Sequence, residues 1–370
     1  MGVPTLNSRL HRVMLAAMVV PLLAACTFAA PLGTPGPSDV AGQTAAPTEL
    51  ARVTPGPDAT PTAKPVRTAK PRRTPKPVVT AEPTAAPTAT PELPDIDHLL
   101  GADGRFTMLL LGVDSRSRQL NGRTDTIMFV TINPKNGKVS MASLPRDMVF
   151  VPYAPGKTYG SGYTRVNALF AYLAGYGGGR KATFKRMVEA MEYTSGIEID
   201  RYAMIGFHGV RNLVDEIGGV DVALARALVD PYMHVRMKGQ EGLILKAGKN
   251  HLNGNVALAF ARTRHTDSDY ERGRRQQQLI AGAIRKVIKR GPEGLPPLVA
   301  KFDGLLKTDI DLGDAPALLA LAGRAKLGDF KSTILGPTKF AGAGDVRYST
   351  KLKIDVVRAF FQQQFGRVRN

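Results

Sequence analysis

The sequence predicts an α/β domain with a mixed central sheet, which follows a long proline-rich stalk. From residue 100 onward, apolar segments of strand length alternate with amphipathic segments of helix length. Two adjacent β-rich segments are joined by a short turn and are predicted to form a hairpin within a sheet of mixed pairing. Residues 27–98 hold 15 of the 27 prolines and show no apolar periodicity. Such a segment buries too little surface to offset the entropy of ordering, so it is predicted to be a disordered linker.

The first 26 residues are typical of an export signal. Arg9 and Arg12 precede an apolar run over residues 13–25, which is shorter than a membrane-spanning helix. The run ends in Leu-Ala-Ala-Cys, which resembles the bacterial lipobox, and Cys26 is the one cysteine of the chain. We therefore expect a lipoprotein whose lipidated Cys26 holds it at the outer face of the bacterial cell membrane. An ordinary secretory signal and an uncleaved anchor are the alternatives.

The net charge and the predicted export from the cytoplasm together restrict the classes of partner that this protein can bind. The net charge is +19, of which +16 falls on residues 96–370, so the basic excess belongs to the folded part. This excess indicates an anionic partner. Export argues against nucleic acid, and therefore against a transcriptional regulator. A single cysteine excludes a disulfide framework and a cysteine-based zinc site.

The elements of the domain follow in order along the chain. Residues 106–113 form an apolar run typical of a buried strand, and 125–132 and 138–144 form a hairpin around an Asn-Pro-Lys-Asn-Gly turn. Further helices are predicted over 165–174, 182–193, 207–217, 253–261 and 270–289, with strands over 201–206 and 220–223. The C-terminal part predicts helices over 298–306, 314–325 and 354–364, and strands near 332–336 and 345–353.

Charged residues gather where the first strands end. Asp114 follows the first strand, Arg123 and Asp125 open the second, and Arg146 and Asp147 close the third. Strand ends are where α/β folds usually bind ligands. Carboxylates with interleaved arginines suit a divalent cation together with a phosphate. The alternative is that these residues are turn caps and surface ion pairs.

A second charged cluster joins two helices. Arg262 and Arg264 close one helix, and Arg272, Arg275 and Gln276 share one face of the next. Guanidinium groups so close together repel one another unless an anion such as a diphosphate neutralises them. A solvated basic face, or a patch for anionic lipid headgroups, is the alternative.

These residues stand in ordered motifs that resemble the LytR-CpsA-Psr family over about 104–290. The motifs are G-x-D-x-R at 112–116, R-x-D-T at 123–126, L-P-R-D at 144–147, V-N-A at 166–168, F-x-G-x-x-x-L-V-D-x-x-G-G-V-x-V at 207–222 and D-x-x-R-x-x-R-Q-Q at 269–277. The resemblance implies a three-layer α/β/α sandwich. It also implies an extracytoplasmic phosphotransferase that moves a glycopolymer from a polyprenyl-diphosphate carrier onto peptidoglycan. The prenyl tail would lie in an apolar tunnel, with Mg²⁺ (or Mn²⁺) at the diphosphate.

The resemblance also assigns roles to residues. Asp114 and Asp125 would hold the cation, and Asp147 or another aspartate would be the base, so the implied catalytic set is Asp114, Asp125, Arg146 and Asp147. The implied diphosphate ligands are Arg123, Arg146, Arg165, Arg262, Arg264, Arg272, Arg275 and Gln276. Residue 165 is commonly lysine in the family, and arginine here keeps the charge with another geometry.

Composition and the resemblance together divide the chain into a signal (1–26), a linker (27–98), a catalytic domain (99–292) and a C-terminal α/β extension (293–370), which lies outside the resemblance and is expected to pack on or next to the catalytic domain. Two other functions are alternatives, the first of which would use the same residues. One is a pyrophosphatase that hydrolyses polyprenyl diphosphates, with water as the acceptor. The other is a non-catalytic lipoprotein that binds anionic wall polymer.

Overall fold

The computed structural model describes residues 94–115, 120, 122–149, 165–290, 305–326, 331–337, 339–343 and 350–366. Its centre is a six-stranded mixed sheet in the order β12-β5-β1-β2-β3-β13. The strands are β1 (Phe106–Val113), β2 (Thr124–Asn133), β3 (Lys138–Leu144), β5 (Arg201–Gly206), β12 (Leu306–Thr308) and β13 (Lys331–Ile334). β1 and β5 pair parallel, as do β3 and β13, and the other pairs are antiparallel. The predicted signal, Cys26 and the linker lie outside the described residues.

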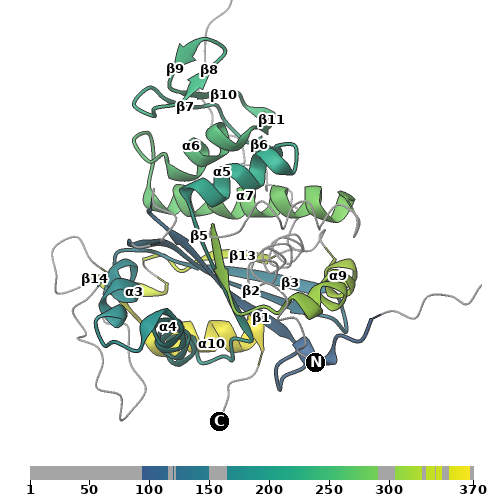
Figure 1. Cartoon of the computed structure of the whole chain (residues 1–370). Coiled ribbons are helices and arrows are strands. Elements are labelled where there is room, and N and C mark those ends of the chain that lie inside the picture. Colours follow the sequence, from purple (N-terminus) through teal and green to yellow (C-terminus); the bar gives the residue numbers. More distant parts are fainter. Residues whose placement is uncertain are drawn as a thin grey trace, which may run out of the picture. The chain divides into compact units, whose positions relative to one another are not determined.

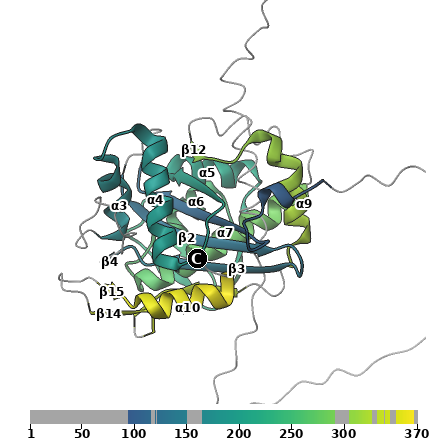
Figure 2. The ribbon, with the colours of Figure 1, turned by 90° about the horizontal axis from the view of Figure 1, so that it is seen from below.

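Helices cover both faces of this sheet (Figures 1 and 2). One face carries α5 (Phe207–Glu216), α6 (Gly254–Arg262), α7 (Asp269–Arg290) and α9 (Ala315–Arg324), and the other carries α3 (Val166–Ala174), α4 (Gly179–Ser195) and α10 (Ile354–Phe365). Alternate residues of β1 enter opposite cores: Met108 and Leu110 pack in one, Leu109 and Leu111 in the other. The predicted three-layer α/β/α sandwich is confirmed.

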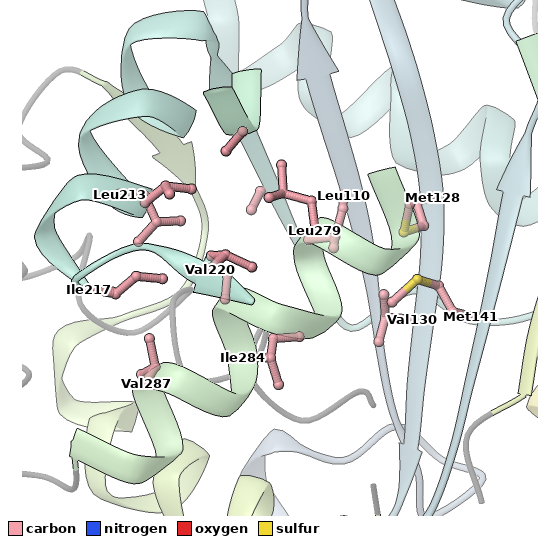
Figure 3. Packing of buried hydrophobic residues seen from close by; sticks show 14 of the residues in the cluster. Leu110, Met128, Val130, Met141, Leu213, Ile217, Val220, Leu279, Ile284 and Val287 are labelled. Atoms are coloured by element: carbon pink, nitrogen blue, oxygen red, sulfur yellow. The ribbon is translucent and has the colours of Figure 1, made fainter. Parts of the chain in front are cut away.

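Helix α7 is fixed by the core that it shares with the sheet. Figure 3 shows its Leu279 and Ile284 in the cluster that contains Leu110 of β1. The helix also packs against β6 (Val220–Leu224), whose Val220 belongs to the same cluster. Gly282 permits this approach, because a Cβ at that position would lie 2.2 Å from Cγ1 of Val220. This packing fixes the position of α7, and with it the position of its first turns beside β1 and β2.

Short elements complete the fold. Between β6 and α6 lie β7 (Leu228–Asp230), β8 (Arg236–Met237), β9 (Gln240–Glu241), β10 (Leu243–Leu245) and β11 (Gly248–Leu252), of which the sequence predicted none. They pair antiparallel as β7–β10, β8–β9 and β6–β11. The remaining elements are η1 (Asp97–Leu99), β4 (Met148–Val149), η3 (Leu312–Asp314), β14 (Ala341–Ala343) and β15 (Thr350–Leu352). No helix of the described residues has the length and hydropathy of a membrane span.

The C-terminal part contributes both edge strands of the central sheet. β12 pairs with β5, and β13 pairs with β3. The predicted helix over 298–306 is wrong at Leu306, which begins β12, and its residues before 305 lie outside the described ranges. Of the predicted strand over 345–353, β15 covers Thr350–Leu352, and residues 345–349 are not described.

A partly buried carboxylate at the sheet makes stability depend on pH. Oδ2 of Asp200 accepts the backbone N–H of Thr107 at 2.6 Å. Burial raises the pKa of Asp200 to about 7, and Glu198 and Asp103 add to this, although the Thr107 hydrogen bond opposes it. The folded state therefore keeps a proton that the unfolded state releases near pH 4. The contribution of Asp200 to the free energy of unfolding is fully present below that pH and is lost as the pH rises to about 7.

We expect this loss to reach at most about 4 kcal/mol. The Asp200→Asn variant should lose less stability between pH 5 and pH 8 than the wild type, because the amide does not ionise. Urea unfolding at the two pH values measures the difference. Asp355→Asn, on an exposed position of α10, is the control and should behave as the wild type does. Equal pH dependence in wild type and Asp200→Asn would contradict the assignment.

Candidate active site

A cavity of about 330 Å³ opens between the end of the central sheet and helices α5, α6 and α7. Along two of the elements that line it, β1 and α7, the cavity wall changes from polar to apolar side chains. On β1 the lining runs from Asp114, just after the strand, back to Leu110. On α7 it runs from Arg272 through Gln276 to Leu279 and then to Ala283. The cavity therefore has a charged end and a hydrocarbon end, as sites for amphiphilic ligands require.

The charged end gathers residues from both predicted clusters. In the described part of the chain, its arginines are Arg146, Arg262, Arg264 and Arg272, and its other polar side chains are Asp114, Asp125, Thr126, His265 and Gln276. Arg123, Asp147, Arg165 and Arg275 do not line the cavity. The structure thus joins most of the predicted site residues in one place and sets four of them apart.

A β-bulge directs Asp125 toward this end. Gly112 pairs with Thr126 and Val113 with Thr124, so Asp125 is the extra residue on β2. Gly112 is required beside the bulge, because a Cβ there would lie 2.8 Å from Cβ of Thr126. The bulge interrupts the regular alternation of the strand and gives Asp125 a place on the cavity wall.

Acidic and basic groups alternate through the charged end. Asp125 accepts Nη1 of Arg146 at 2.7 Å on Oδ2 and Nδ2 of Asn167 at 3.0 Å on Oδ1. Nε of Arg146 lies 3.4 Å from Oδ1 of Asp269, whose Oδ2 accepts Nη2 of Arg272 at 2.9 Å. The carboxylates therefore hold both guanidinium groups in place before a ligand binds, which is the arrangement that electrostatic catalysis needs.

Arg272 has a donor without a partner. Its side chain is 7 % exposed, and Nε is buried without a hydrogen-bond partner in the described part of the chain. Leaving such a donor unpaired costs about 1–3 kcal/mol. Burial also lowers the pKa of Arg272, and Asp269 opposes this shift. An anion in the cavity would relieve both costs.

Arg262 and Arg264 are exposed at the end of α6. The guanidinium carbon of Arg262 lies 4.3 Å from the centre of the Phe207 ring, a cation–π contact that orients it. Within the described ranges, neither arginine forms an ion pair with a carboxylate. Gln276 donates Nε2 to the carbonyl of Ala261 at 3.1 Å, which ties this end of α6 to α7. The two positive charges remain available to an anionic ligand.

Arg275 instead holds the α6–α7 connection together. Its side chain is 6 % exposed, and it forms a two-point ion pair with Asp267. Its Nε donates to the carbonyl of Phe260 at 3.1 Å, and its Nη2 also donates to the carbonyl of Thr263. Every nitrogen of this guanidinium thus has a protein acceptor. Arg275 fixes the segment that carries Arg262 and Arg264 rather than reaching the cavity itself.

Among the residues that the structure describes, Asp114 and Asp125 are the two carboxylates of the cavity wall. Both oxygens of Asp125 already accept a hydrogen bond, and a carboxylate oxygen has a further lone pair for a cation. Among the described residues, no cluster of three or more His, Cys, Asp or Glu side chains forms a closed metal site. Two carboxylates next to phosphate-binding arginines fit Mg²⁺, which commonly completes its shell with substrate phosphate and water.

Three residues of this region had no predicted role. Asn167, which contacts Asp125, belongs to the V-N-A motif, and that motif was the signal for it. His265 lines the cavity directly after Arg264, and Asp230 of β7 contacts it from a buried position. No sequence pattern joins Asp230 to His265, because 35 residues separate them.

Known proteins resemble this chain in sequence and in fold. The family model described as LytR_cpsA_psr family matches residues 76–335. The polyisoprenyl-teichoic acid–peptidoglycan teichoic acid transferase TagV of Bacillus subtilis is 34% identical over 185 residues, which are 49% of this chain and 44% of that protein. The chain spans about half the length of the curated relatives it matches.

Two solved structures are similar in fold. The crystal structure of B. subtilis TagV has a TM-score of 0.55 and 24% identity, covering 73% of this chain and 100% of that one. The structure described as TagT bound to LIIa-WTA has a TM-score of 0.51 and 25% identity, covering 70% of this chain and 89% of that one. The α/β/α arrangement is therefore shared with both.

Proposed function

The chain belongs to the LytR_cpsA_psr family, and from that premise we propose that it transfers a glycopolymer from a polyprenyl-diphosphate carrier to peptidoglycan. Its relatives TagV and TagU are named as transferases of teichoic acid to peptidoglycan. The observation that carries the proposal is the cavity, whose charged end suits a diphosphate and whose apolar end suits the hydrocarbon next to it. A polymer-binding lipoprotein would need the basic surface but not the apolar interior.

The residues divide the work of a displacement at phosphorus. Arg262 and Arg264 bind the diphosphate from α6, and Arg146 and Arg272 bind it from the opposite wall. Asp125 and Asp269 keep these two guanidinium groups oriented. Because charge in the transition state spreads over the phosphoryl oxygens, fixed positive groups stabilise it directly. A bound Mg²⁺, held by Asp114 and Asp125, would supply further neutralisation of that charge.

We also propose that the domain works outside the cytoplasm on a lipid anchor. The support is the lipobox-like segment that ends at Cys26 and the proline-rich residues 27–98 after it. A donor with a polyprenyl tail lies in the membrane, and a lipidated Cys26 keeps the domain beside that membrane. Peptidoglycan is then the acceptor that a tethered domain of this kind meets.

Mass spectrometry of the protein purified from a bacterial membrane tests both proposals. We expect a co-purified polyprenyl phosphate or diphosphate, and a mature chain that begins at a lipidated Cys26. The Arg264→Ala variant should bind this lipid about 1.5–3 kcal/mol more weakly, because one charge-assisted contact is lost. Arg274→Ala removes an exposed arginine of α7 outside the cavity lining and should bind as the wild type does.

A transfer assay completes the experiment. Purified protein, carrier-linked glycopolymer and peptidoglycan should give polymer bound to peptidoglycan, with release of polyprenyl phosphate. Release of lipid phosphate without any attached polymer would identify the pyrophosphatase instead. Folded protein that carries no lipid and attaches no polymer would overturn the proposed function and leave the polymer-binding lipoprotein.

A further inference from the structure

Next to the charged end of the cavity lies a carboxylate–imidazole pair that the roles assigned above do not use. Nδ1 of His265 lies 2.9 Å from Oδ2 of Asp230. His265 lines the cavity, and its side chain is 52 % exposed, whereas the Asp230 side chain is 0 % exposed. A fully buried aspartate joined to a half-exposed histidine at a reaction site is the pattern of an orienting carboxylate and a proton acceptor.

The surroundings of Asp230 fix both its charge state and the tautomer of His265. Asp230 also accepts the hydroxyl of Thr263 on Oδ2 and the backbone N–H of Tyr232 on Oδ1 at 3.0 Å. Three donors converge on this carboxylate, so the ionised form, which only accepts, is favoured. Nδ1 of His265 must then carry the proton that it donates to Asp230, which leaves Nε2 as the basic atom.

We propose that His265 is the general base that takes the proton of the acceptor hydroxyl, and that Asp230 is its positioning residue. The inference deepens the proposed function and rests on it. As the hydroxyl oxygen forms a bond to phosphorus, the bond from phosphorus to the bridging diphosphate oxygen breaks. The hydroxyl proton passes to Nε2 of His265, and polyprenyl phosphate leaves with the bond electrons. No other reactant is needed.

Two other candidate bases, Asp125 and Asp147, suit this step less well. Asp125 already accepts Arg146 and Asn167, and in the proposed function it also faces the cation. Asp147 does not line the cavity. Imidazole is the side chain that commonly exchanges a proton near neutral pH. The charged groups that share the site with His265 are Asp230, Arg262, Arg264, Arg146, Arg272, Asp114 and Asp125.

The chain offers a matched control for the pair. Nδ1 of His251 lies 2.6 Å from Oδ1 of Asp221, and neither residue lines the cavity. His251 is about as exposed as His265, at 56 %. His265→Gln should reduce the turnover of glycopolymer transfer about 100-fold or more, with undiminished co-purified lipid. His251→Gln should leave turnover and lipid unchanged.

Two measurements separate a base from a structural contact. The wild-type turnover should fall toward low pH as an imidazole protonates, and the residual activity of His265→Gln should lack this step. Asp230→Asn should alter the same step of the pH profile. In the substrate-free wild type, ¹⁵N NMR of the imidazole should show the Nδ1–H tautomer of His265.

Three outcomes of these measurements would contradict the inference. An Nε2–H tautomer in the wild type overturns the inference. Full turnover with an unchanged pH profile in His265→Gln also overturns it, while the transfer by the wild type upholds the proposed function. A wild type that transfers no polymer overturns the proposed function and this inference together.

Discussion

The Asp125→Asn variant is expected to transfer glycopolymer about 10²–10³-fold more slowly than the wild type. The amide keeps the size of the side chain but loses the charge that pairs with Arg146 at 2.7 Å. Its NH₂ group would also face a donor, because Arg146 and Asn167 occupy both oxygens. Arg146 would lose its fixed direction, and the cation would lose a ligand.

The measurement is a single-turnover assay with saturating donor, which separates the transfer step from lipid binding. Asp355→Asn removes a carboxylate from an exposed position of α10 and should keep full activity. The Asp125→Asn protein should also unfold at nearly the wild-type urea concentration, because its side chain is only partly buried. Wild-type transfer in Asp125→Asn would remove Asp125 and its contact with Arg146 from the mechanism.

The layers of the fold could be predicted because long elements carry periodic patterns. β1 is an almost wholly apolar run buried on both faces, and α7 carries an apolar stripe over its second half, where Leu279, Ile284 and Val287 are buried. The strands between β6 and α6 have two to five residues, which is too short for a period to be recognised. β12 has three residues, and its pairing with β5 depends on a partner about 100 residues earlier in the chain.

The charged end of the cavity could be predicted in outline for a related reason. The strand-end rule indicated Asp114 and Asp125, and the family resemblance assigned Arg262 and Arg264 to the same ligand. Helical spacing placed Arg275 on the same face as Arg272. Spacing along one helix does not show what covers that face, and the α6–α7 connection covers Arg275 but leaves Arg272 on the cavity wall.

Contacts between segments that lie far apart in the chain could not be predicted from the sequence. Asp230 and His265 meet because β7 lies beside the end of α6, and neither residue belongs to a recognisable short motif. Thr263 joins them through the same carboxylate. A buried carboxylate that collects three donors can be identified only when the two segments, 230–232 and 263–265, are seen together. Residues that orient other residues are therefore harder to predict than residues that lie at strand ends.

The ion pair of Arg275 and Asp267 gives the largest expected effect on stability. Both side chains are buried, at 6 % and 9 % exposure. Arg275→Met leaves Asp267 as an uncompensated buried charge and also removes the donors to the carbonyls of Phe260 and Thr263. We expect the free energy of unfolding to fall by about 3–5 kcal/mol. Urea unfolding followed by circular dichroism measures this, since the chain has no tryptophan.

Arg274→Met is the matched control, because Arg274 is the adjacent arginine of α7 and pairs with Glu271 in solvent. Its side chain is 64 % exposed, so the cost should stay within about 0.5 kcal/mol. If Arg275→Met unfolds like the wild type but no longer binds the carrier lipid, Arg275 is a direct ligand of the diphosphate. If it is destabilised, and Arg275→Lys recovers only part of the loss, the two-point geometry of the guanidinium is what holds the α6–α7 connection. The arginines that touch the diphosphate would then depend on one that does not.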